Sequence, residues 1–210
     1  VTLDDTETGI KEFRENYSAY FEANKSLLPA GYSSHGNDPR VILVPGVGAV
    51  TAATTIKENV MLADIATHTH NVAARVVDVF GDGDTISDAE IFGFDYWPME
   101  LFKLKNKPAP AQLDGHIIIV TGAGSGIGRG VALELGKRGA HLVLADIEEP
   151  GLLEVEKEFA ENKCNPPLLV LGDQSKEADV KATVTKAIKH FGGLDGVVIN
   201  AGIGISDKLE

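Results

Sequence analysis

Apolar residues in the second half of the chain gather into four short runs, separated by stretches with helical spacing. The four runs are Ile117–Val120, His141–Ala145, Leu168–Leu171 and Val197–Ile199. Runs of this kind are typical of parallel strands that are buried on both faces. After the first run, Ile127, Val131 and Leu135 recur at four-residue steps, which predicts an amphipathic helix. The order of elements therefore predicts an α/β fold with the first four strands of a doubly wound parallel sheet.

Two further helices are expected between these runs. Pro150 suits the first turn of a helix that carries Leu152, because the N–H group that proline lacks is unused there. Ser175 is expected to cap a third helix, which Gly192 ends.

The first hundred residues have a mainly helical pattern. Residues 1–10 are acidic and unpatterned and are expected to form a lead-in, followed by a helix over Glu12–Asn24. Gly31–Pro39 is dense in helix-breaking residues and predicts a loop. Val41–Val44 predicts a short buried strand that ends at the proline and glycines after it.

A long helix is expected from about Thr55 to Phe80. Ser87 with Glu90 three residues later forms a capping box, which predicts the start of another helix. A short helix that carries Leu101 and Leu104 is expected after it.

Prolines indicate a boundary in the middle of the chain. Pro108 and Pro110 lie in a stretch that looks like a linker. We expect a linker at 107–112 between two domains, 1–106 and 113–210.

Composition limits the cellular compartments and the classes of partner that we expect for this chain. The net charge of −12 argues against nucleic acid and against anionic membrane, because both need a basic surface. Cys164 is the single cysteine, which favours a reducing compartment, and no apolar run is long enough to span a bilayer. We therefore expect a cytoplasmic protein. Since the chain begins at Val1 and stops soon after the fourth run, we also expect it to be an internal part of a longer protein.

Glycines follow the first strand-like run at positions 122, 126 and 128. Gly122 would let the chain turn tightly, and Gly126 would let the backbone approach a pyrophosphate. Gly128 would let the helix and the strand pack closely. The free N–H groups of the helix that starts here favour a phosphate ligand.

Written as Thr-Gly-x-x-x-Gly-Ile-Gly, residues 121–128 resemble the cofactor loop of short-chain dehydrogenases, which have a Rossmann-type sheet. Asp146, Asp173 and Asn200-Ala201-Gly202 match the later motifs of that family in order. A carboxylate at Asp146 can bind ribose hydroxyls and repels a 2′-phosphate, so NAD is favoured over NADP. The residues that the resemblance assigns to cofactor binding are Gly122, Ser125, Gly126, Ile127, Gly128, Asp146, Asp173, Asn200, Ala201 and Gly202.

The catalytic Tyr-x-x-x-Lys motif of that family has no match in the chain. None of the four tyrosines, Tyr17, Tyr20, Tyr32 and Tyr96, has a lysine four residues later. No catalytic residue is therefore assigned, and these 210 residues alone are expected to perform no hydride chemistry.

Two segments of the first half, Asp38–Gly48 and Asp95–Leu101, resemble a bifunctional family in which an aldolase-derived region precedes a short-chain dehydrogenase. That family is the rhamnulose-1-phosphate aldolase/short-chain dehydrogenase fusion. The resemblance implies cleavage of a sugar phosphate and oxidation of the aldehyde product, such as lactaldehyde. It also implies a small-molecule aldehyde or alcohol as the partner, and a homo-oligomer as the full-length protein.

A His-x-His pair at His68 and His70 is similar to the zinc pair of class II aldolases. On a strand the two rings would share a face, but on a helix they lie about 200° apart and cannot hold one ion. Because the surrounding pattern is helical, we assign no metal here.

Two alternatives to the fusion stay open. One is a stand-alone short-chain dehydrogenase with an unrelated leader, and the other is a non-catalytic module that binds NAD. The second would leave the Val197–Ile199 strand on an unprotected sheet edge, which is unfavourable.

Overall fold

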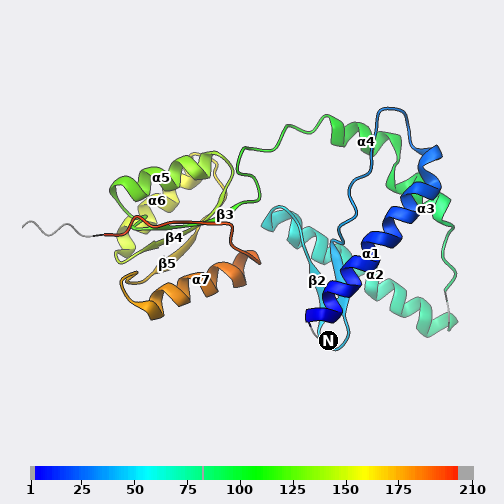
Figure 1. The fold of residues 1–210 in the computed structure, drawn as a ribbon, viewed down its shortest axis with the longest axis horizontal. Coiled ribbons are helices and arrows are strands. Elements are labelled where there is room, and N and C mark those ends of the chain that lie inside the picture. The colour runs from blue at the N-terminus through cyan, green and yellow to red at the C-terminus, as the bar shows by residue number, and fades with distance from the viewer. Residues whose placement is uncertain (1–2, 82, 203–210) are drawn as a thin grey trace, which may run out of the picture. The chain divides into compact units, whose positions relative to one another are not determined.

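A computed structural model describes residues 3–81 and 83–202 of the chain. It divides into two compact units, residues 1–108 and 109–210. Figure 1 shows a mainly helical first unit and an α/β second unit, and each is described by itself below.

The first unit consists of helices and one hairpin. Its elements are α1 (Leu3–Asn24), the short 3-10 helix η1 (Lys25–Leu27), β1 (Val41–Val44), β2 (Gly48–Thr51), α2 (Ile56–Phe80), α3 (Asp88–Asp95) and α4 (Pro98–Lys105). The expected lead-in over residues 1–10 is wrong, because α1 begins at Leu3. Asp5 and Glu7 lie in its first two turns, where carboxylates interact favourably with the positive end of the helix dipole.

The strand expected at Val41–Val44 is present but is not buried. It pairs antiparallel with β2, Val41 opposite Thr51 and Val44 opposite Gly48, and Leu43 is 64% exposed. The sequence does not predict β2, because Gly46 and Gly48 indicate the end of a strand. In the structure Gly46 has a φ of +75° in the turn between the two strands.

The predicted starts of α2 and α3 are confirmed. Thr55 caps α2 by accepting a hydrogen bond from the Glu58 N–H at 3.2 Å. Ser87 caps α3, and the Glu90 carboxylate accepts the Ser87 N–H in return at 2.9 Å. These side chains satisfy N–H groups that the first turn of a helix leaves without partners.

Aromatic side chains form the core of the first unit. Phe92, Tyr96 and Leu101 are buried, and the rings of Phe92 and Tyr96 stack with their centroids 4.4 Å apart. Tyr20 and Phe21 of α1 pack against Phe92 at 5.7 and 5.8 Å. The core therefore ties α1 to the two short helices α3 and α4.

The second unit is a four-stranded parallel sheet with helices on both faces (Figure 1). Its elements are β3 (Ile117–Thr121), α5 (Gly126–Lys137), β4 (His141–Asp146), α6 (Glu149–Glu161), β5 (Leu168–Leu171), α7 (Glu177–Phe191) and β6 (Gly196–Val198). The strand order is β5-β4-β3-β6. The predicted fold class is therefore confirmed, with all four strands close to their expected bounds.

Two buried clusters lie on opposite faces of this sheet. Leu142 and Leu144 of β4 face α5 and α6 and pack with Phe159, whereas Val143 and Ala145 belong to the cluster that includes Ala187 of α7. This alternation shows why the apolar run of β4 is continuous, since that strand is covered on both sides.

One helix start differs from the sequence prediction. Pro150 lies in the first turn of α6 as expected, but α7 begins at Glu177 with Lys176 as its N-cap. Ser175 is not the cap, because its hydroxyl donates to the Asp173 carboxylate at 2.7 Å.

Candidate functional site

The strand order places a topological switch point between β3 and β6. The sheet runs in one direction from β3 to β4 and β5, and β6 lies on the other side of β3. In open α/β sheets, ligands bind outside the carboxyl ends of the strands at such a switch point. The glycine loop after β3 and Asn200 after β6 therefore meet at the same place.

The glycine loop has the backbone geometry that its sequence predicts. Gly122 has a φ of +65°, and a Cβ there would lie 2.9 Å from Asn200 Nδ2. A Cβ on Gly128 would lie 2.0 Å from the carbonyl oxygen of Gly122, so the start of α5 packs directly on the loop. Gly126 has a φ of +52°, and no atom of the described residues lies within 4 Å of its Cβ position. Side chains are thus excluded at two positions by protein atoms, while the third faces open space.

Hydrogen bonds from Asn200 connect this loop to the end of β6. Its Nδ2 donates to the carbonyl oxygens of Thr121 and Gly122, at 3.0 and 3.2 Å. The Thr121 hydroxyl accepts the N–H groups of Asn200 and Ala201, each at 3.0 Å, and donates to Val198 O at 3.3 Å. Thr121 is 7% exposed. All five bonds join two segments that lie 77 to 80 residues apart in the sequence, so the loop is held against the end of β6.

Asp146 lies at the end of β4 beside the loop. One carboxylate oxygen accepts the Gly124 N–H at 2.8 Å, and the other accepts the Glu148 N–H at 3.0 Å. A carboxylate oxygen has two lone-pair positions, so each oxygen keeps the capacity to accept another hydrogen bond.

Gly124 and Gly151 allow this contact. A Cβ on Gly151 at the start of α6 would lie 2.7 Å from Gly124 O, and a Cβ on Gly124 would lie 3.0 Å from Asp146 Oδ2. Sequence reasoning missed Gly151, and the available signal was a glycine inside a predicted helix, which is unfavourable without a packing reason.

Asp173 has a local structural partner. Its carboxylate accepts the Ser175 hydroxyl at 2.7 Å and the Ser175 N–H at 3.0 Å, and it lies 3.4 Å from Lys176 Nζ. The hydrogen bonds from Ser175 hold the pKa of Asp173 below its ordinary value. The carboxylate therefore stays charged and shapes the turn before α7.

The remaining predicted residues lie at the start of α5 or after β6. Ser125 is the N-cap of α5 and makes no side-chain cap hydrogen bond within the described residues, so its hydroxyl and the first N–H groups of α5 are available. Ile127 is 79% exposed, and Ala201 and Gly202 are exposed beyond β6.

Arg129, one turn further along α5, is engaged elsewhere. Its guanidinium pairs with Glu158 and lies 3.1 Å from Glu154, both on α6. These hydrogen bonds raise the pKa of Arg129 and lower that of Glu158. The Arg129 side chain therefore links α5 to α6 and is not available to a ligand at the glycine loop.

His68 and His70 lie on α2, in the helical setting that the sequence predicts. Among the described residues no group of three or more His, Cys, Asp or Glu side chains is placed to hold a metal ion. In that same part of the chain, no helix combines the length and the apolar character that crossing a membrane requires.

Comparison with known proteins agrees with the two units. Residues 2–104 match the family described as aldolase class II, second domain, and residues 116–210 match the short chain dehydrogenase family. The chain therefore contains an aldolase class II segment followed by a short-chain dehydrogenase segment. The predicted combination of the two is confirmed at this level.

One relative covers both segments. The chain is 28% identical over 208 residues to the uncharacterized oxidoreductase YuxG of Bacillus subtilis, across 97% of this chain and 29% of that protein. A tetrahydroxynaphthalene reductase of Pestalotiopsis fici is 42% identical over 90 residues, across 42% of this chain and 32% of that protein. The chain thus spans about a third of the length of these relatives.

One similar solved structure covers less than half of this chain. A 3-ketoacyl-(acyl-carrier-protein) reductase of Brucella melitensis complexed with NADH is 43% identical, with a TM-score of 0.40 over 43% of this chain and 35% of that one.

Proposed function

We propose that the chain is part of an NAD-dependent short-chain oxidoreductase that is fused to a sugar-phosphate aldolase. The observation that carries the proposal is the Asp146 carboxylate, which is fixed by two backbone N–H groups beside a glycine loop that opens onto free space at Gly126. The fold and the glycine loop support binding of a dinucleotide. The Asp146 carboxylate supports a preference for NAD over NADP.

The residues of the loop fit such a cofactor. The open position of Gly126 and the first N–H groups of α5 would receive the pyrophosphate. Asp146 would accept hydrogen bonds from the adenosine ribose, and Glu148 close by adds to the repulsion of a 2′-phosphate. Thr121 and Asn200 would position the loop, and Asp173 would shape the adenine side. The bound nicotinamide would supply the hydride acceptor.

The full-length protein is proposed to cleave a sugar phosphate such as rhamnulose-1-phosphate and to oxidise the aldehyde product, such as lactaldehyde. The domain division of 1–106, linker 107–112 and 113–210 belongs to this proposal, as do a cytoplasmic location and a homo-oligomer. The match of residues 2–104 to the aldolase family removes the alternative of an unrelated leader.

Calorimetric titration with NAD and NADP tests the cofactor assignment. We expect the 210-residue chain to prefer NAD. Asp146→Asn keeps an acceptor for the Gly124 N–H but removes the charge. Since hydrogen bonds to charged groups contribute about 1.5–3 kcal/mol, affinity for NAD should fall roughly 10- to 100-fold.

The matched control is Glu149→Gln, which removes an equal charge from the first turn of α6. It should leave the preference for NAD unchanged. Equal affinity of the parent chain for NADP, or the same loss in both variants, contradicts the proposed role of Asp146.

A further inference from the structure

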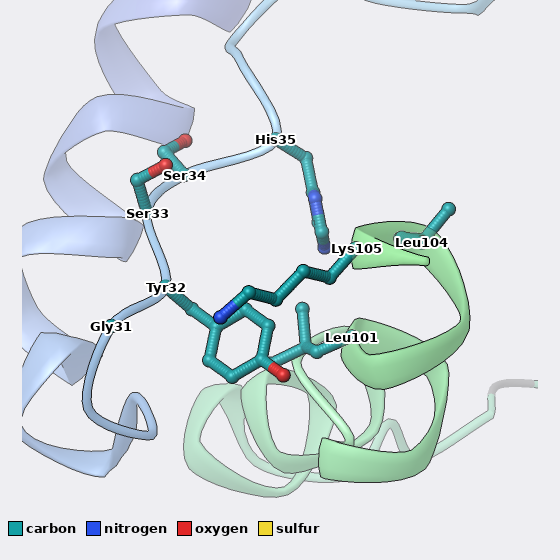
Figure 2. Close-up of a pocket in the computed structure, with 8 residues that line it drawn as sticks. All are labelled: Gly31, Tyr32, Ser33, Ser34, His35, Leu101, Leu104 and Lys105. Atoms are coloured by element: carbon teal, nitrogen blue, oxygen red, sulfur yellow. The ribbon is translucent and has the colours of Figure 1, made fainter. Parts of the chain in front are cut away.

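The first unit contains a pocket of about 240 Å³ between the loop after η1 and α4. Figure 2 shows the eight residues that line it, with the loop on one side and the side chains of α4 on the other. These residues are Gly31, Tyr32, Ser33, Ser34, His35, Leu101, Leu104 and Lys105. Neither the dehydrogenase segment nor the glycine loop contributes to it.

Contacts with the aromatic core hold the loop side of the pocket in place. The His35 ring stacks on Tyr96, with ring centroids 4.7 Å apart and ring planes 2° apart. The backbone N–H of His35 donates a hydrogen bond to Tyr96 Oη at 3.4 Å. Tyr96 is 2% exposed, and its hydroxyl shares a hydrogen bond with Tyr17 at 2.9 Å. The loop is therefore attached to a buried side chain, although its residues lie outside helices and strands.

The lining is electropositive within an acidic half of the chain. Residues before Asn106 include 8 basic and 16 acidic side chains, but none of the eight lining residues is acidic. Lys105 Nζ lies 5.6 Å from the centre of the Tyr32 ring, and the described residues give it no ion pair. On α4, helical spacing puts Lys105 on the same face as Leu101, while Lys103 pairs with a glutamate on another face.

One further polar side chain of the lining is directed toward α4. Figure 2 shows the His35 ring on that side, whereas the hydroxyls of Ser33 and Ser34 point away from Lys105. The Ser34 hydroxyl accepts the Gly36 N–H at 3.2 Å. A lysine ammonium with an imidazole donor suits an oxyanion.

We propose that this pocket binds the oxyanion group, phosphoryl or carboxylate, of a small metabolite. Lys105 supplies the charge, the His35 ring supplies a hydrogen-bond donor, and Tyr32 with Leu101 contacts the apolar part of the ligand. The volume lies below the roughly 300–1,000 Å³ of pockets for drug-sized ligands, so the ligand has few heavy atoms. The inference stands independently of the dehydrogenase proposal.

The only tryptophan, Trp97, provides a local readout, because it is the N-cap of α4 and its carbonyl oxygen accepts the Leu101 N–H at 3.0 Å. Trp97 fluorescence of the 210-residue chain is titrated with inorganic phosphate, acetate and chloride at constant ionic strength. We expect a saturable change with phosphate or with acetate and none with chloride, and the active ion identifies the oxyanion class. The titration is repeated with excess NAD, which should not compete.

Three variants locate the site. Lys105→Met keeps the apolar stem and His35→Phe keeps the ring on Tyr96, so both should fold and weaken binding at least 10-fold. Lys103→Met removes the same charge from another face of α4 and should leave binding unchanged. The proposal is overturned if neither oxyanion gives a saturable change, if NAD abolishes the change, or if Lys103→Met weakens binding as much as Lys105→Met. Circular dichroism spectra that match the parent confirm the fold of each variant.

Discussion

Gly128→Ala and Gly130→Ala form a matched pair in the first turns of α5. A Cβ at Gly128 would lie 2.0 Å from Gly122 O and 2.5 Å from Asn200 Nδ2. A Cβ at Gly130 would meet no atom of the described residues within 4 Å. The two substitutions add the same methyl group two residues apart, but only the first collides with the glycine loop.

The expected difference follows from these distances. An ordinary Cβ contact begins at 3.4 Å, and a backbone carbonyl in a tight turn cannot rotate aside as a side chain would. Overpacking of a tight site costs about 1–3 kcal/mol or more, and the backbone contact puts Gly128→Ala at the upper end. Gly130→Ala should gain about 0.5–1 kcal/mol, because alanine loses less backbone entropy in a helix. The difference in unfolding free energy is therefore about 4 kcal/mol.

Thermal unfolding monitored by far-ultraviolet circular dichroism measures this difference. For a unit of about 100 residues, 3 kcal/mol corresponds to a decrease in Tm of at least about 12 °C. Trp97 fluorescence, which comes from the first unit, should show an unchanged transition because the added methyl group meets only atoms of the second unit. NAD affinity should fall in Gly128→Ala and stay unchanged in Gly130→Ala.

The packing argument is refuted if Gly128→Ala unfolds at the parent temperature and binds NAD as the parent does. It is also refuted if both variants lose the same stability, since a general intolerance of alanine in α5 would then explain the result.

Three further predictions concern hydrogen bonds. Thr121→Val removes the buried acceptor of two backbone N–H groups, so we expect a loss of about 2 kcal/mol or more in urea unfolding, which Thr121→Ser should restore. Ser87→Ala removes the cap of α3 and should cost about 1 kcal/mol, measured from the Trp97 transition. Burial and the hydrogen bond to Tyr96 raise the pKa of Tyr17 above its ordinary value of 10.0, so the native state holds this proton more tightly than the unfolded state. The stability that this proton contributes is complete below the ordinary pKa and is lost as the pH rises above it. Between about pH 9 and 11, the unfolding free energy of the Tyr17→Phe variant should therefore fall less than that of the parent.

The sheet of the second unit was predictable because its central strands, β3 and β4, are covered on both faces. Leu142, Val143 and Leu144 are all buried, so burial leaves an uninterrupted apolar run in the sequence. In the hairpin of the first unit, the apolar run Val41–Val44 predicted a strand but also its burial, although Leu43 is mostly exposed. Its partner strand contains Gly48, which sequence reasoning assigned to a strand end.

For the candidate site, local geometry was predictable and side-chain partners were not. The positive φ of Gly122 and the close packing at Gly128 follow from the spacing of the glycines. By contrast, the contact of Gly151 with the loop and the ion pairs of Arg129 depend on how α6 packs against α5. Long-range packing of this kind leaves no periodic pattern in a single sequence.

The bonds between Asn200 and the glycine loop also bear on the order of assembly. Asn200 lies 79 residues after Thr121, so the loop cannot reach its final shape until β6 has joined β3. Contacts of such large sequence separation require the closure of a long segment of chain. The first strand and helix of the unit therefore form an incomplete loop on their own. If the loop binds a dinucleotide as proposed, the affinity for that cofactor would report whether the fourth strand has joined the sheet.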